Sequence, residues 1–247
     1  MWQAFRNAHH AEGFELITVG MDTAGVEACR PFIEAASPEH PSLIDTHHRV
    51  AEQFGVINIP NAVWIDEDGV IVRPAEAAPA PPSMRDGDRQ SSLGDMGEMP
   101  ERVMAIMGEA MKIESDPEAY EAALVDWITN GADSEFALSP EQAIERSRPR
   151  DDSTSRGAAH FELAAHLELA GEHEAAIGHF RQAHELVPDN FSYKRQAWSL
   201  EPGPEGPLNR FWQGPTEGAE ADWPYAGDWL ADVKEMGAAN YYPAFQP

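Results

Sequence analysis

The sequence is poor in sulfur that could carry redox chemistry. Among its 247 residues there is one cysteine, Cys29. An intramolecular disulfide is therefore excluded, and the printed sequence contains no C-x-x-C dithiol. We expect Cys29 to be a small, half-buried side chain, with a catalytic thiol as the alternative.

Positive charge is also scarce. Seventeen Lys and Arg stand against 43 Asp and Glu, which gives a formal charge of −26 and an isoelectric point near 4.5. Such acidity argues against nucleic acid or an anionic membrane as partner, because both would repel the chain. No apolar run approaches the ~20 residues of a membrane span. No signal peptide is visible, so the chain as printed is expected to be cytoplasmic, while its true compartment stays open.

The sequence has no recognisable metal or cofactor motif, although it contains ten histidines. In the densest group, successive histidines are 6, 7, 6 and 5 residues apart, so no consecutive pair has the i,i+4 spacing of two ligands on one helical face. This group comprises His160, His166, His173, His179 and His184. A phosphate-binding glycine loop, a G-x-S-x-G motif and a zinc-protease motif are missing too. We therefore predict neither a metal nor a cofactor.

What the sequence does contain is a clear hairpin pattern within Phe54–Val72. A short apolar run, Ala62–Ile65, is followed by Asp66–Gly69, in which the glycine can adopt a positive φ. Val70–Val72 then predicts a returning antiparallel strand. Pro60 stands just before the first strand, where its missing N–H takes no bond from a central ladder.

The residues before this hairpin predict an α/β arrangement. A helical pattern over Met1–Glu12 is followed by strand formers in Phe14–Gly20. A helix should then run through Phe32 to Ala36, with Pro31 in its first turn. Asp45 can cap a further helix, Thr46–Phe54, which leads into the hairpin.

This order, with the pattern x-G-V-x-x-I-P-x-x-x-x-I-D-x-D-G-x-I, resembles the second half of a thioredoxin-like domain of the ResA/TlpA (AhpC/TSA, redoxin) type. The resemblance implies that Pro60 follows a cis bond and that Ile59 and Pro60 bind substrate through the backbone around them. The simpler alternative is a trans proline that enters an edge strand. The resemblance also implies thiol–disulfide or peroxide-reducing chemistry, with protein thiols, disulfides or peroxide as substrates of an intact member.

The first βα unit of that family is missing from the sequence. In the family it carries the dithiol at a helix N-terminus, where the helix dipole lowers the pKa of the nucleophilic thiol. Its strand lies between those expected at Leu16 and Val63, so its loss would expose two ladder edges. We expect a truncated sequence whose C-x-x-C, or selenocysteine equivalent, lies upstream of Met1; a redox-dead remnant is the alternative. We predict no catalytic residue in the printed chain, because Cys29 falls in an inserted helix.

Residues 76–100 are predicted to be a linker, because Pro, Ala, Gly, Ser and Asp dominate from Arg73 to Pro100. Residues 101–200 then show helical periodicity. Asp116–Pro117 predicts a helix start, and Ser139 and Gln142 have the spacing of a capping box.

Residues 157–190 resemble one tetratricopeptide repeat, with His160 where the family usually has a large aromatic. The matching residues are Leu163, Ala164, Leu167, Gly171, Ala176, Ile177, Phe180, Ala183, Pro188 and Asn190. Because about three repeats are normally needed for stability, we expect the helices of 101–147 and 190–199 to act as degenerate neighbours. The alternative function follows from this domain: a non-catalytic module that binds a peptide or protein partner.

Residues 201–247 form a tail rich in Gly and Pro, yet too aromatic for a disordered segment. We expect it to wrap over the helices and bury its rings, with a partner-binding surface as the alternative. The aromatic residues are Phe211, Trp212, Trp223, Tyr225, Trp229, Tyr241, Tyr242 and Phe245. The sequence thus predicts an N-terminally incomplete α/β thioredoxin-like domain (1–75), a linker, an all-α tetratricopeptide-like domain (101–200) and this tail.

Overall fold

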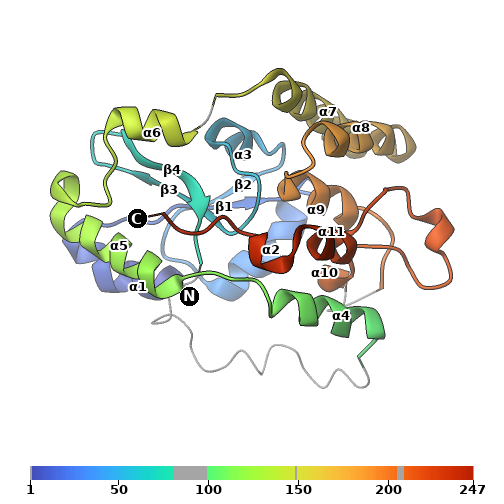
Figure 1. The fold of residues 1–247 in the computed structure, drawn as a ribbon, viewed down its shortest axis with the longest axis horizontal. Coiled ribbons are helices and arrows are strands. Elements are labelled where there is room, and N and C mark those ends of the chain that lie inside the picture. Colours follow the sequence, from blue (N-terminus) through green and yellow to red (C-terminus); the bar gives the residue numbers. More distant parts are fainter. Residues whose placement is uncertain (1, 80–98, 148, 205–208, 247) are drawn as a thin grey trace.

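The computed structural model describes residues 2–79, 99–147, 149–204 and 209–246, which form helices around two small β-sheets (Figure 1). Most of the predicted linker, 80–98, lies outside the described residues. The chain begins with α1 (Trp2–His9) and a short 3-10 helix, η1 (His10–Glu12), which ends at Gly13 with φ 97°.

The first sheet pairs β1 (Thr18–Met21) with β2 (Ser42–Asp45) in parallel. Parallel neighbours need a crossover connection, and α2 (Val26–Ala36) supplies it. Pro31 lies in the middle of α2, so its predicted place in the first turn is wrong. Because proline has no backbone N–H, α2 lacks one helical hydrogen bond at this position.

Asp45 caps the next helix, α3 (Arg49–Phe54), as predicted. Its carboxylate accepts the backbone N–H groups of Arg49 at 3.0 Å and Val50 at 2.7 Å. The helix nevertheless begins three residues later than Thr46, because His48 has a left-handed backbone with φ 54°. This extra loop places the His48 side chain in the interior, where it is 3% exposed.

The predicted hairpin is present as β3 (Asn61–Ile65) and β4 (Ile71–Ala77), which pair antiparallel. In the turn, Gly69 has φ 79°, and the Asp66 carboxylate accepts the N–H of Val70 at 2.8 Å. The strand β4 continues past the predicted domain end at 75. Ala78 is buried and donates its N–H to the carbonyl of Pro60, so the linker starts later than expected.

Helices downstream of the linker pack on this hairpin. The helix α5 (Pro117–Asn130) leads through η4 (Gly131–Asp133) to α6 (Pro140–Ser147), which contacts β4. Asp116 caps α5, and Ser139 and Gln142 form the predicted capping box. One apolar core joins the two layers; its buried members are Phe5, Trp64, Val72, Ala78, Tyr120, Ala123 and Leu124.

Of the helices of residues 101–147, α5 therefore does not act as a neighbour of the repeat-like hairpin, contrary to the prediction. The apolar face of α5 is buried against the β3–β4 sheet, which leaves it no such face for a helical array. The helix α4 (Glu101–Ala110) lies against α10 (Asn209–Trp212) and α11 (Trp229–Met236), and its buried Ile106 belongs to the same core as Ala164 and Ala176 of the repeat-like segment.

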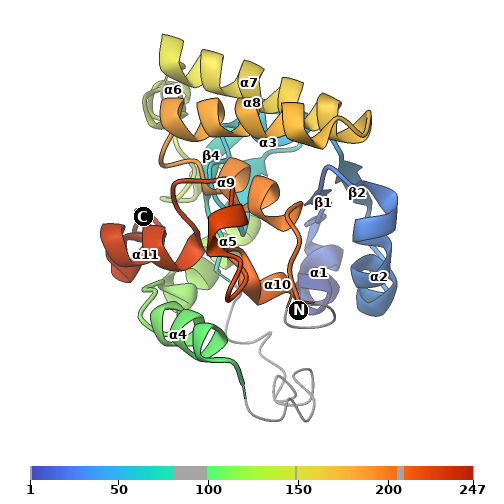
Figure 2. The same cartoon turned by 90° about the vertical axis from the view of Figure 1, so that its right-hand side faces the viewer.

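The repeat-like segment folds as a helical hairpin of α7 (Asp152–Leu169) and α8 (His173–Leu186), with α9 (Phe191–Ser199) packed next to it (Figure 2). Gly171 makes the turn with φ 79°. Ala164 and Ala176 are fully buried in the seam, where their small side chains let the helices approach closely. A helical domain is thus present after the α/β part.

The aromatic tail wraps over these helices, which confirms the expected burial. The last segment contains α11 and two short 3-10 helices. The first, η6 (Glu220–Asp222), precedes α11, and the second, η7 (Ala238–Asn240), follows it. Four of the predicted rings are less than 9% exposed: Trp212, Tyr225, Trp229 and Tyr241. The side chain of Phe211 lies outside the described residues. The tail shares one core with α7, α8 and α9 and is not a separate unit.

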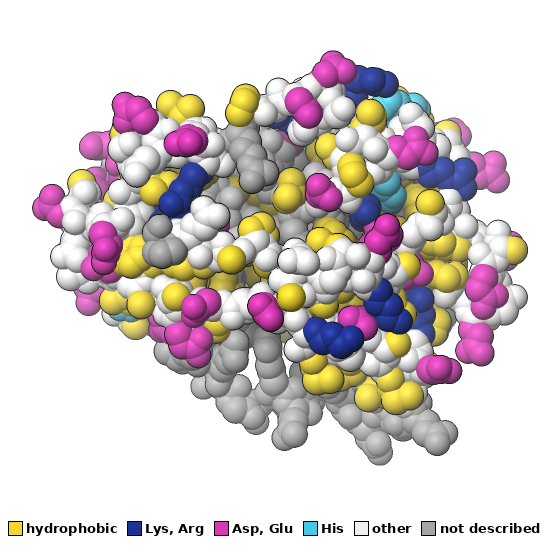
Figure 3. All heavy atoms as spheres, in the orientation of Figure 1, with side chains coloured by type: hydrophobic (Ala, Val, Ile, Leu, Met, Phe, Trp, Pro, Cys, Tyr) yellow, Lys and Arg dark blue, Asp and Glu magenta, His cyan; other side chains and the backbone are white. Residues whose placement is uncertain are grey.

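The surface carries the acidity seen in the sequence. On the face shown in Figure 3, acidic side chains are spread over most elements, with a few Lys and Arg among them. No helix within the described ranges is long and apolar enough to cross a membrane.

Candidate functional site

The loop Ile57–Pro60, which contains the predicted substrate-binding residues Ile59 and Pro60, enters β3 through a cis bond between these two residues, as the resemblance implies. Ile59 is 38% exposed. Its backbone N–H is held by the Asn58 side chain, whose Oδ1 accepts it at 2.9 Å. Asn58 itself is buried, although the sequence pattern gave it no role.

The C-terminal segment covers this loop. Asn58 Nδ2 donates to the carbonyl of Tyr241 at 3.0 Å, and the Tyr242 hydroxyl donates to the carbonyl of Ile59 at 2.8 Å. Burial raises the pKa of Tyr242 to about 12, so the hydroxyl keeps its proton for this bond at neutral pH. Both backbone polar groups of Ile59 are thus occupied by the chain itself.

A buried polar cluster lies where β1 and β2 end. The carboxyl ends of parallel strands meet at one edge of a sheet, and there the loops carry Thr23 and His48. Both loops bind one side chain of α9: Gln196 Oε1 accepts the backbone N–H of Thr23 at 2.9 Å and lies 3.0 Å from His48 Nε2. Burial lowers the pKa of His48, so its ring is neutral at neutral pH.

The α9 helix therefore closes the edge of the sheet that binds ligands in many α/β folds. Next to the cluster, the backbone N–H of Ser192 donates to the carbonyl of Ile57 at 3.0 Å. Three buried polar atoms here have no hydrogen-bond partner in the part of the chain that the structure describes: Thr23 Oγ1, His48 Nδ1 and Ser192 Oγ. None of these residues was predicted as a site, because only tertiary structure brings α9 to the two loops.

Cys29 is poorly placed for chemistry. It lies on α2, 9% exposed, and its Sγ would be 3.1 Å from a Cβ atom added to Gly20 in β1. Burial, with a smaller contribution from the carboxylate of Asp22, raises the pKa of the thiol. Since the thiolate is the nucleophile, both effects make Cys29 unreactive.

Among the described residues, Arg73 is the most buried charged side chain, and the sequence predicted it only as the first residue of the linker-like composition. It is fully buried in β4, where Nε and Nη2 bind the two carboxylate oxygens of Glu76 at 2.8 and 2.9 Å. Its Nη1 donates to the carbonyl of Phe136, and Nη2 also donates to the carbonyl of Gln246. The sequence does carry a signal for this burial. Arg73 stands in a run of strand formers, and an arginine that is buried there needs a paired carboxylate, which Glu76 supplies.

Two of the ten histidines face each other in the helical hairpin. His160 and His179 approach each other across α7 and α8, with their Nδ1 atoms 2.9 Å apart. In the part of the chain that the structure describes, no group of three or more His, Cys, Asp or Glu could hold a metal ion.

Comparison of the chain with protein-family models, curated proteins and solved structures finds no match in any of the three.

Proposed function

We propose that this chain is a thioredoxin-like protein of the ResA/TlpA (AhpC/TSA, redoxin) type, fused to a tetratricopeptide-like hairpin and related to thiol–disulfide oxidoreductases and peroxide-reducing enzymes. One observation carries the proposal. A parallel pair, β1–β2, and an antiparallel pair, β3–β4, form two separate sheets, with Ile59–Pro60 at the entrance to β3. Such a domain would show these two pairs if the strand between β1 and β3 were taken out.

The exposure of the strands supports this. In β1 all four residues are only half-buried, and Ile17 just before it is 59% exposed. On the other sheet, Ile65 is 44% exposed. Among the described residues, each of these half-exposed strands pairs on one side only. A strand between them would stabilise both sheets, because it would form hydrogen bonds with the two unpaired strand edges.

The reactive dithiol would directly follow that strand in the sequence. A helix N-terminus after it would carry the C-x-x-C dithiol, or its selenol equivalent, near Ile59 and Pro60, which would bind substrate. A thiolate there would attack a substrate disulfide, and the second thiol would release the reduced product as the pair is oxidised. Cys29 cannot replace the pair, because it is a single buried thiol with a raised pKa.

An insulin-reduction assay and a peroxide assay on two forms test the proposal. One form is the printed chain, and the other is extended by the in-frame upstream segment, with dithiothreitol as the electron source. We expect activity in the extended form alone, with no change on Cys29→Ala. Upstream DNA that encodes no strand followed by C-x-x-C or U-x-x-C would contradict the truncation. Activity of the printed chain that disappears in Cys29→Ala would contradict the placement of the site.

A second function, a non-catalytic interaction module, is favoured by the α7–α8 hairpin. Its seam carries the repeat pattern, and Leu163 on α7 is 42% exposed although the pattern expects an apolar contact there. A neighbouring peptide or helix would cover such a residue. Cross-linking of the printed chain in a host lysate, compared with Leu163→Glu, tests this function. Partners captured equally by both forms would exclude the hairpin as their binding surface.

A further inference from the structure

We propose that Asn58, Arg73 and Tyr120 form a groove that binds an extended peptide, and that Tyr241–Gln246 of the same chain fills it in this structure. We call this segment the C-terminal strap. The groove needs no thiol, so it goes beyond the proposed redox function. Failure of the redox assays would leave it intact.

Two buried side chains of the groove bind the backbone of the strap. Asn58 is 6% exposed and donates from Nδ2 to the carbonyl of Tyr241. Arg73 is fully buried and donates from Nη2 to the carbonyl of Gln246. Backbone carbonyls are present in every peptide, so these two donors select an extended chain of suitable length and not a particular sequence.

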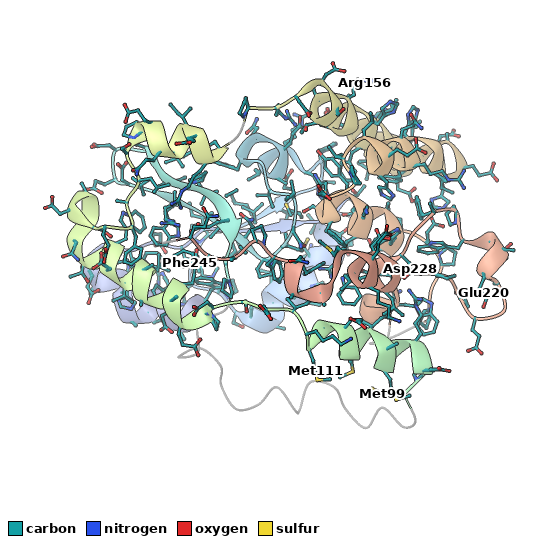
Figure 4. All side chains as sticks on the ribbon, in the orientation of Figure 1. Met99, Met111, Arg156, Glu220, Asp228 and Phe245 are labelled. Carbon is teal, nitrogen blue, oxygen red and sulfur yellow. The ribbon has the colours of Figure 1, made fainter. Side chains whose placement is uncertain are left out.

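The groove also holds one aromatic side chain. The ring of Phe245 packs edge-on against Tyr120, with 5.5 Å between ring centroids, and lies 5.0 Å from the Cζ atom of Arg73. Figure 4 shows Phe245 between α5 and the β3–β4 hairpin. Quadrupole and cation–π attraction favour an aromatic ring at this point. The partner that fits is therefore an extended peptide with an aromatic residue directly before the carbonyl that Arg73 binds.

Beyond Tyr241, whose ring is buried in the core, the strap is held in a way that allows exchange. Its first residue still donates a backbone N–H, from Tyr241 to the carbonyl of Ala238. Among the hydrogen bonds of the described residues, none joins two backbone groups within residues 242–246. Side chains hold this part, and Pro243 and Ala244 are exposed. Segments with few backbone bonds open locally without unfolding the domain.

A labelled peptide with the sequence of residues 240–246, added to the full chain, tests the groove by fluorescence anisotropy. In the wild type the strap competes, so binding should be weak. In Phe245→Ala the strap loses its aromatic contact, and we expect the added peptide to bind about tenfold more tightly, or better. A peptide with alanine at the Phe245 position should bind weakly to both forms.

Phe32→Ala is the matched control, because Phe32 lies on α2 and is 69% exposed. It should bind the peptide as the wild type does. A folded Phe245→Ala chain that binds no more tightly than the wild type would overturn the groove. So would equal binding of the peptide and its alanine form.

Tyr242→Phe keeps the proposal testable if Phe245→Ala does not fold, because it removes only the hydroxyl that binds the Ile59 carbonyl. It should increase peptide binding and speed hydrogen exchange at the amides of Ala244 and Phe245. If these amides exchange as slowly in the wild type as the amides in the core of α9, the strap is permanently closed and the proposal is wrong.

Discussion

The guanidinium of Arg73 lies 5.0 Å from the ring centroid of Phe245, although one residue belongs to the β3–β4 hairpin and the other stands near the end of the chain. On its other side, Arg73 is 5.2 Å from the ring of Trp64. A charge can be buried in this way because Glu76 neutralises it and two aromatic faces attract it. The contact links the β-hairpin to the C-terminal strap.

Replacing Arg73 by methionine should strongly destabilise the fold. The change leaves the half-buried Glu76 carboxylate and the carbonyl of Phe136 without their donor. We expect a loss of about 3–5 kcal/mol in the free energy of unfolding, measured by urea titration. Arg30→Met is the control: this side chain is half-exposed, and its ion pairs on α2 should be worth less than about 1 kcal/mol. Equal losses in the two variants would show that Arg73 is not a structural centre.

Gln196→Ala should loosen α9 from the sheet. The glutamine is the acceptor for the Thr23 N–H and the His48 ring, so the change leaves two buried donors unpaired. Each unpaired group costs about 1–3 kcal/mol, and we expect a loss in that range or somewhat above it. Chemical denaturation measures the loss. Gln182→Ala on the exposed face of α8 should change stability by less than about 0.5 kcal/mol; a similar loss in both would contradict the role of Gln196.

Replacement by alanine of two glycines in the helical hairpin should change the stability of the fold in opposite directions. A Cβ atom on Gly157 would lie 2.6 Å from Cγ2 of Val187, whereas nothing lies within 4 Å of one on Gly178. Gly157→Ala should therefore destabilise by about 1–3 kcal/mol through overpacking. Gly178→Ala should stabilise by about 0.5–1 kcal/mol, since alanine is the better helix former. Thermal melts of both variants decide; stabilisation by Gly157→Ala would mean that α7 and α8 do not approach this closely.

Stability should fall in mild acid because of His184. Burial beside Trp198 and Tyr225 lowers the pKa of His184 to about 4. Between that value and its ordinary pKa near 6.5, the unfolded chain binds a proton that the folded chain does not. The contribution is therefore complete above pH 6.5 and is lost as pH falls toward 4, by about 3 kcal/mol at most. Unfolding at several pH values measures it, and His184→Phe should flatten this part of the curve.

His173 provides a control of opposite sign. The Glu168 carboxylate, 2.8 Å from Nδ1, raises the pKa of His173, and Glu201 adds to the effect. Its stabilisation is present below the ordinary pKa and is lost as pH rises through the raised pKa. His173→Gln should therefore reduce stability at low pH and change little at high pH. If His173→Gln instead flattens the acid-side loss, the assignment of that loss to His184 is wrong.

Local structure could be predicted wherever neighbouring residues in the sequence decide it. The hairpin turn at Asp66–Gly69, the cap at Asp45, the capping box of Ser139 and Gln142 and the helical hairpin around Gly171 all follow from short-range hydrogen bonds and positive φ. The cis bond before Pro60 came from the family resemblance, not from spacing.

The sequence by itself thus determined most of the elements, although not the residues at which α2, α3 and β4 begin or end. Only the tertiary structure decided that α5 covers the β3–β4 sheet, that Gln196 binds Thr23 and His48, and that the strap lies over Asn58 and Ile59. These contacts join residues far apart in the chain, and an apolar helix face or a polar side chain does not specify its distant partner. Burial and hydrogen bonding select that partner when the whole chain packs.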